Sequence, residues 1–143
     1  MTGPVSVLGL IAAILTLTVT GCNNSASLVP VSGVVTFDGG PPPDSGTVVF
    51  KPESVAEGFA NRSGRATFST DGKFVVTSFQ KGDGLAPGKY TAEVSCYHSA
   101  PKIGTKDPFG DASNIDKSYE PASLVVEPGS NDLVVKFDVP LKK

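Results

Sequence analysis

The amino-acid sequence predicts an all-β fold, a seven-stranded antiparallel β-sandwich that follows an apolar N-terminal segment. Sixteen Gly and twelve Pro among 143 residues favour short strands joined by tight turns, because both residues are unfavourable inside helices. From residue 29 onward, runs of β-branched and aromatic residues are interrupted by Gly, Pro or Asp, which is typical of strands. A chain of this length holds one small domain and short accessory segments.

The N-terminal quarter differs from the rest of the chain because it carries no charge before Asp38. Residues 5–19, VSVLGLIAAILTLTV, form an apolar stretch as long as a signal-peptide core and shorter than the roughly 20 residues of a membrane span. We therefore expect an exported protein. An uncleaved N-terminal membrane helix and a buried element of the domain are the alternatives.

The apolar stretch ends at Val19-Thr20-Gly21-Cys22, which resembles the lipobox of bacterial lipoproteins. The resemblance implies a lipoprotein signal peptide over residues 1–21 and a lipidated Cys22, whose acyl chains, such as palmitate, hold the protein on the membrane. Residues 22–29 are mostly small and polar and form a flexible tether. Asn23 stands where an Asp often retains lipoproteins at the inner membrane, so the expected location in the cell envelope is the outer membrane or cell surface.

Seven strands are expected in the domain, at residues 29–37, 46–52, 64–70, 73–79, 88–97, 123–128 and 132–140. Three consecutive prolines follow the first strand and cannot donate to a strand ladder, so they belong to a turn. Asp71-Gly72 separates the third and fourth strands and predicts a hairpin with a type I′ turn. Gly129-Ser130-Asn131 forms the turn between the last two.

Alternation of apolar and polar residues predicts which side of each strand is buried. In the fifth strand the buried side holds Tyr90, Ala92, Val94 and Cys96, and in the last it holds Leu133, Val135, Phe137 and Val139. Two sheets that each bury one face are expected to pack as a sandwich.

Several short motifs occur in order along the domain. They are Val31-Ser32-Gly33-Val34-Val35, Gly46-Thr47-Val48-Val49-Phe50, Asp71-Gly72-Lys73-Phe74 and Pro87-Gly88-Lys89-Tyr90, followed by residues 119–124 and the turn at 128–131. In this order and spacing the chain resembles the transthyretin-like (prealbumin), carboxypeptidase regulatory-like β-sandwich domain of small bacterial lipoproteins. The resemblance implies one such domain over residues 30–140, acting as a non-catalytic accessory or binding module.

Residues that could carry out catalysis are few. His98 is the only histidine, and in a strand it would share a face with Cys96 at about 6 to 7 Å, beyond the hydrogen bond that activates a nucleophile. We therefore expect no catalytic residue, no enzymatic activity and no cofactor. Cys96 is expected to be a reduced core residue if Cys22 is lipidated, and a disulfide between Cys22 and Cys96 is the alternative.

The long loop over residues 99–122 carries the remaining candidates. Its oxygen ligands suit calcium in type, but their spacing matches no calcium-loop template, so no metal site is predicted; they are Asp107, Asp111, Asn114 and Asp116. Phe109, in the middle of the loop, either contacts a partner or folds back over the sandwich edge. Phe109, Tyr97 and Tyr119 are the candidate binding residues.

The expected function is that of a lipid-anchored cell-envelope protein whose sandwich is a binding, scaffolding or surface-interaction module. Its expected partners are the membrane, through Cys22, and an unknown protein or glycan. Nucleic acid is not expected, because the net charge of −2 gives no basic field. A glycan-binding surface protein is one alternative. The other is a hydrolase of the transthyretin-like kind, which relies on several histidines.

Overall fold

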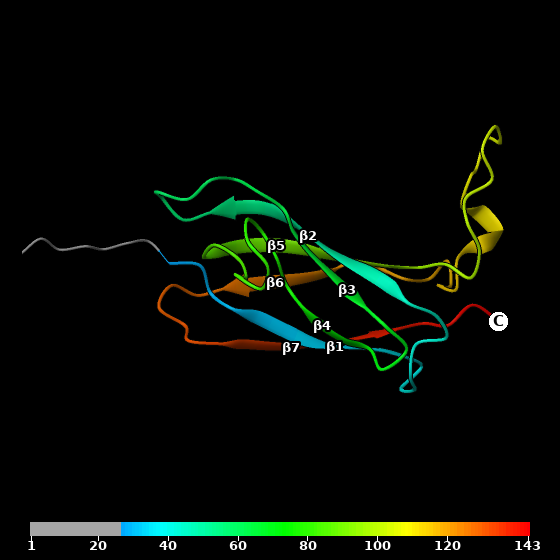
Figure 1. Cartoon of the computed structure of the whole chain (residues 1–143), viewed down its shortest axis with the longest axis horizontal. Coiled ribbons are helices and arrows are strands. Elements are labelled where there is room, and N and C mark those ends of the chain that lie inside the picture. The colour runs from blue at the N-terminus through cyan, green and yellow to red at the C-terminus, as the bar shows by residue number, and fades with distance from the viewer. Residues whose placement is uncertain (1–26) are drawn as a thin grey trace, which may run out of the picture.

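The computed structural model describes residues 27–143 as seven strands in two facing sheets (Figure 1). The elements are β1 (Val31–Phe37), β2 (Gly46–Val55), β3 (Gly64–Phe68), β4 (Lys73–Val75), β5 (Gly88–Cys96), the 3-10 turn η1 (Gly110–Ala112), β6 (Ala122–Val126) and β7 (Leu133–Val139). The prediction of an all-β domain is confirmed. The signal peptide predicted over residues 1–21 and the lipidation of Cys22 lie outside the described residues. Within the described part of the chain, no helix is long and apolar enough to cross a membrane.

One sheet has the strand order β4-β1-β7 and the other has the order β3-β2-β5-β6. Every pair of neighbours is antiparallel except β1 and β7, which run parallel from Val31 opposite Leu133 to Phe37 opposite Val139. The expectation of a wholly antiparallel sandwich is therefore wrong for this pair. The reason is that β6 returns the chain to the end of the domain where β1 begins, and β7 starts from there.

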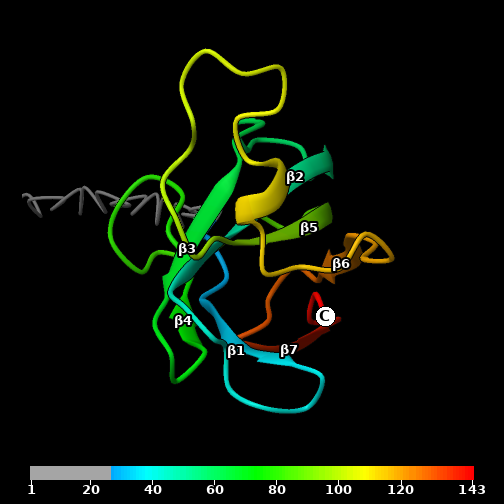
Figure 2. The ribbon, with the colours of Figure 1, turned by 90° about the vertical axis from the view of Figure 1, so that its right-hand side faces the viewer.

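The predicted hairpin at Asp71-Gly72 is also corrected. The chain does reverse there, with the Gly72 N–H donating to the Ser69 carbonyl at 2.9 Å. Gly72 has φ 74°, but Asp38 is the only non-glycine residue with positive φ among those described, so the turn is not type I′. The two strands then separate, because β3 pairs with β2 and β4 pairs with β1 in the opposite sheet (Figure 2).

The fourth strand is much shorter than the 73–79 predicted, because the segment after Val75 turns around one carboxylate. Asp83 accepts hydrogen bonds from the backbone N–H groups of Ser78, Phe79 and Gln80 at 2.7 to 2.9 Å. A carboxylate that satisfies three consecutive donors competes with the strand ladder for them. The alternation of apolar and polar residues over 73–79 therefore extends past the end of β4 at Val75.

The core lies between the sheets and follows the predicted alternation. Tyr90, Ala92, Val94 and Cys96 are all buried, as expected for the inner face of β5. The rings of Phe50, Phe74 and Phe137 meet at its centre with centroids 6.0 to 6.3 Å apart. Complete burial of one such ring contributes about 1.5 to 3 kcal/mol relative to exposure.

Gly33, in the middle of β1, leaves room for residues of β4 and β7, its two neighbours in the same sheet. A Cβ atom there would lie 2.1 Å from the carbonyl oxygen of Val135 and 2.7 Å from the ring of Phe74. The ring therefore occupies the space that any other residue at position 33 would need. The Val-x-Gly-x-Val motif of the first strand has this packing as its physical cause.

Candidate functional site

The long loop over residues 97–121 lies at the end of the domain opposite to the point where the chain enters (Figure 1). Entry is fixed by Val29, which exchanges two backbone hydrogen bonds with Leu85 at 2.8 and 2.9 Å. β5 begins close to Leu85 and ends at Cys96, where the loop starts. A nine-residue strand at about 3.3 Å per residue separates the entry from the loop by roughly 26 Å.

The base of the loop continues the strand ladder beyond β5. The N–H of His98 donates to the carbonyl of Ala112 at 3.0 Å, and the N–H of Asn114 donates to the carbonyl of Cys96 at 2.9 Å. Further out, Lys102 N–H donates to Pro108 O at 2.9 Å. These bonds tie the outgoing and returning arms of the loop together and place η1 beside the end of β5.

Two of the three predicted binding residues are brought together there. The rings of Tyr97 and Phe109 lie with centroids 4.8 Å apart at an interplanar angle of 33°. Both stay accessible, with 38% of Tyr97 and 43% of Phe109 exposed. An exposed pair of touching aromatic rings offers a large apolar surface of fixed shape, which is the usual basis of a binding contact.

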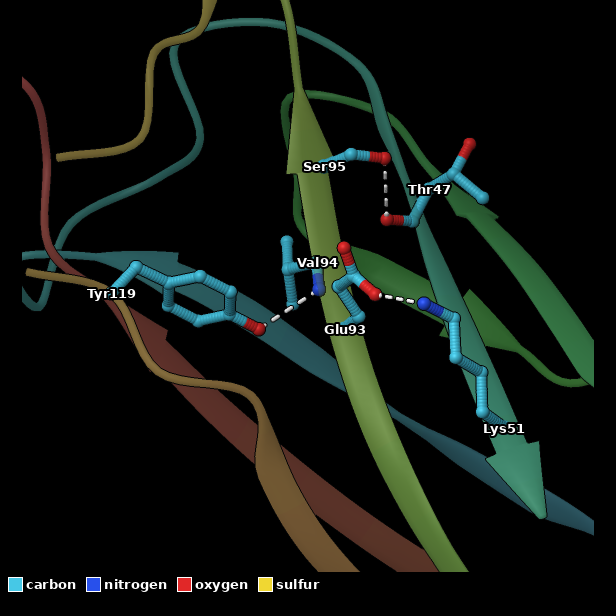
Figure 3. Close-up of polar contacts among 6 residues, drawn as sticks. All are labelled: Thr47, Lys51, Glu93, Val94, Ser95 and Tyr119. Carbon is cyan, nitrogen blue, oxygen red and sulfur yellow. Dashed lines mark hydrogen bonds and ion pairs between the residues drawn. The ribbon is translucent and has the colours of Figure 1, made fainter. Parts of the chain in front are cut away.

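Tyr119 has a different place in the structure. Its half-buried ring packs against the core, and its hydroxyl accepts a hydrogen bond from the Val94 N–H at 2.8 Å (Figure 3). β6 covers β5 only from Gly88 to Ala92, so no strand supplies an acceptor for that N–H. Burial raises the pKa of the Tyr119 hydroxyl. Tyr119 thus completes the wall of the sandwich, and its hydroxyl is already engaged.

The side chain of Asn114 makes three contacts at the loop base, two of which join it to the rest of the domain. Its Nδ2 donates to Asp44 Oδ2 at 2.8 Å and lies 3.4 Å from Cys96 Sγ, while its Oδ1 lies 3.2 Å from His98 Nδ1. Sequence reasoning considered Asn114 only as a possible metal ligand and missed this role. No local signal could have shown it, because Asp44 lies seventy positions earlier in the chain.

Cys96 is poorly placed to act as a nucleophile. The thiol is completely buried, and its Sγ lies 3.4 Å from the carbonyl oxygen of Asp44. The exposed ring of His98 contacts Asn114. A thiol without access or a contacting base is a poor nucleophile, because the thiolate is the reactive form.

The acidic residues of the loop are spread over separate local contacts. Asp116 accepts from the N–H and hydroxyl of Ser118 at 2.9 and 2.7 Å, which lowers the pKa of its carboxyl, and Asp111 lies 3.9 Å from the Lys142 ammonium. Asp107 lies beside Gly110. Among residues 27–143, no group of three or more His, Cys, Asp or Glu side chains is placed to hold a metal ion.

A shallow polar hollow of about 330 Å³ adjoins Tyr97 on the outer face of the four-stranded sheet. It is lined by Ser45, Thr47, Thr67 and Ser95 as well as by Phe68. Figure 3 shows Thr47 and Ser95 on neighbouring strands, where the Ser95 hydroxyl donates to the Thr47 carbonyl at 3.4 Å. The ion pair between Lys51 and Glu93 lies further along the same face.

Comparisons with protein families, with curated proteins and with solved structures found no match to this chain.

Proposed function

We propose that this protein is a lipid-anchored cell-envelope protein whose β-sandwich is a non-catalytic binding module, with the Tyr97–Phe109 pair as its contact surface. The observation that carries the proposal is that the chain entry and the exposed aromatic pair lie at opposite ends of the domain. Val29, the first residue tied to the domain, lies at one end, and the exposed aromatic pair lies at the other, roughly 26 Å away along β5. An anchor at Cys22 would therefore leave the pair facing away from the membrane.

The lipobox-like Val19-Thr20-Gly21-Cys22 supports the anchor, and the short polar tether after it would keep the domain near the bilayer. Acyl chains such as palmitate on Cys22 would place the protein at the outer membrane or cell surface. The two-sheet arrangement of seven strands fits the resemblance to transthyretin-like domains, and we propose that residues 30–140 belong to that class.

Rigidity at the contact surface supports binding as the activity. The Tyr97–Phe109 pair stands on a loop base that Asn114 joins to Asp44, so the pair is held in place before any partner arrives. Preorganised aromatic side chains lose little conformational entropy on binding. The complete burial of the Cys96 thiol opposes thiol chemistry, which supports a binding role over a catalytic one.

A glycan ligand is the second candidate, favoured by the polar hollow beside Tyr97. Sugar rings stack on aromatic faces while their hydroxyls exchange hydrogen bonds with polar side chains. The hollow joins Tyr97 to four serine and threonine residues. A glycan array probed with wild type and with Tyr97→Ala distinguishes this candidate: signals that vanish in the variant support it, and a blank array with wild type rejects it.

The main proposal is tested in two steps, first on the protein produced by cells and then by crosslinking in intact cells. Intact mass and detergent partitioning of wild type and Cys22→Ala show whether residues 1–21 are removed and acyl mass is added. A photo-crosslinking amino acid at position 109 is then compared with one at position 134, where Val134 is 75% exposed on β7. Lipidation with a discrete adduct from position 109 alone is the expected result. An unlipidated wild type, or equal adducts from both positions, contradicts it.

A further inference from the structure

β3 and β4 diverge into different sheets (Figure 2). A groove of about 810 Å³ lies between them. One wall carries Arg65 and Thr67 from β3, and the other carries Lys73 and Val75 from β4, with Lys81 at one end. Val75 is 57% exposed, so the groove presents a bare apolar side chain between cations. It shares Thr67 with the hollow beside Tyr97 but includes neither Tyr97 nor Phe109.

The groove is cationic in a chain that is acidic as a whole. Residues 61–83 contain four lysines and arginines and two carboxylates, Asp71 and Asp83, although the complete chain has a net charge of −2. Asp71 already accepts hydrogen bonds from the Ser69 hydroxyl and from the Lys73 N–H, both at 3.0 Å. Asp83 likewise accepts hydrogen bonds from three backbone N–H groups, so positive charge is in excess around the groove.

The three cations that line the groove form no ion pair in the described part of the chain, although Lys73 lies close enough to Asp71 to act on its carboxylate. Among the described residues, the ion pairs are Lys51–Glu93, Lys89–Glu53 and Lys142–Asp111, none of which involves Arg65, Lys73 or Lys81. A cluster of one sign around a concave surface focuses its field on the space that a ligand would occupy.

Both walls of the groove are edge strands. β3 has only β2 as a sheet neighbour and β4 has only β1, within the part of the chain that the structure describes. A single bridge joins the walls there, in which Arg65 and Thr77 exchange hydrogen bonds at 2.8 and 2.9 Å. Edge strands carry backbone N–H and C=O groups that an added strand can pair with. On β4 the Lys73 N–H already donates to Asp71, so pairing with an added strand would centre on Val75.

We propose that this groove binds an extended acidic segment of a partner protein, which adds as a strand along β4. Carboxylates on one face of the segment would lie beside Lys73, Arg65 and Lys81, and apolar residues on its other face would enter the gap between the sheets. The charges select an acidic ligand. The open strand edges select a peptide over a lipid surface, because a headgroup layer offers no N–H and C=O groups in strand register.

The test uses the full-length protein in a neutral detergent and measures fluorescence anisotropy of a labelled eight-residue peptide. The peptide alternates Glu and Val, so that a β-strand presents all its carboxylates on one face. A second peptide carries N-methyl groups on alternate residues, which removes strand donors and keeps the charge. The expected result is saturable binding of the first peptide, weakened by at least about tenfold on methylation.

The double variant Lys73→Glu/Lys81→Glu tests the cations, and Lys136→Glu on β7 is the matched control. The double variant should weaken binding by at least about tenfold and the control by less than about twofold, with the difference shrinking at high salt. Circular dichroism of each variant verifies the fold. No peptide binding, equal binding of the methylated peptide, or equal weakening by the control overturns the proposal. So does a soluble anionic lipid, dihexanoyl phosphatidylglycerol, that binds where the peptide does not.

Discussion

The Tyr119 hydroxyl accepts a hydrogen bond from the Val94 backbone N–H at 2.8 Å, at the point where β6 has ended and β5 continues. A side chain here replaces a strand as the partner of a backbone donor in a part-buried position. Because β5 leads directly into the loop with the Tyr97–Phe109 pair, this bond supports the strand on which the proposed contact surface depends.

Replacement of Tyr119 by Phe should therefore lower stability. The variant keeps the ring in the core and leaves the Val94 N–H without an acceptor, a change that costs about 1 to 3 kcal/mol. Urea denaturation measures the free energy of unfolding. Tyr97→Phe is the matched control, since it removes a hydroxyl from an exposed ring and should have little effect. Equal losses in the two variants would show that the Val94 bond is not responsible.

Asn114→Asp should loosen the loop base. The substitution places a second carboxylate where Nδ2 now donates to Asp44 at 2.8 Å, and it removes the amide donor that faces Cys96. Like charges at this distance repel. We expect faster hydrogen exchange at the His98 and Asn114 amides, whose hydrogen bonds join the loop arms, with exchange in β2 unchanged. His98→Ala removes a single weaker contact and serves as the control. Unchanged exchange in Asn114→Asp would refute the role of the bridge.

Sequence patterns predicted the strands and their buried faces because alternation with period two survives whichever strand lies alongside. They did not predict sheet membership. The Asp71-Gly72 signal concerns a local turn, and whether β3 and β4 then pair depends on β1 and β2, which compete for them. The parallel pairing of β1 with β7 could not be predicted either, since buried and exposed residues alternate in the same way in parallel and antiparallel strands.

The same limit applies to the site. Tyr97 and Phe109 could be named from the sequence as loop aromatics, but their contact depends on hydrogen bonds between the arms of the loop. Asn114 and Asp44 are far apart in the chain, so no motif joins them. The groove between β3 and β4 exists because these strands separate, which contradicts the hairpin that local residues favoured.

Gly33→Ala should destabilise the domain severely. Its Cβ would lie 2.1 Å from a backbone oxygen of Val135, which cannot move without displacing β7, and 2.7 Å from the Phe74 ring. We expect a loss above about 3 kcal/mol, at the upper end of overpacking effects. Gly40→Ala is the control, because its Cβ would meet only the Phe37 carbonyl at an ordinary 3.5 Å. Thermal denaturation should separate the two variants clearly, and similar melting temperatures would contradict the packing argument.

Asp83 should make stability depend on pH in the acid range. Burial opposes its ionisation, but the backbone N–H groups of Ser78, Gln80 and Phe79 outweigh burial and lower the pKa of the carboxyl. A lowered pKa in the folded state contributes stability above the unfolded value of about 4, and this contribution is lost as the pH falls through the folded pKa. The stability difference between wild type and Asp83→Asn should be largest near neutral pH and shrink below about pH 4.

Urea denaturation at several pH values measures that difference. Lys81→Gln removes a charge from the same loop without touching the three N–H donors, so its difference from wild type should stay nearly constant over the same range. A constant difference for Asp83→Asn would show that its carboxylate form does not stabilise the loop.

Cys96 should react with a thiol reagent only when the domain opens. Its side chain is completely buried among core residues, and Sγ lies 3.4 Å from the Asp44 carbonyl oxygen, so no reagent reaches it in the folded state. In Cys22→Ala, where Cys96 is the only thiol, labelling should be slow in buffer and immediate in denaturant; rapid labelling in buffer would contradict the burial.

Unfolded wild type then decides between the two cysteine hypotheses. One reactive thiol per chain agrees with lipidation of Cys22, whereas none before reduction and two after it would require the disulfide and remove the anchor on which the proposed function rests.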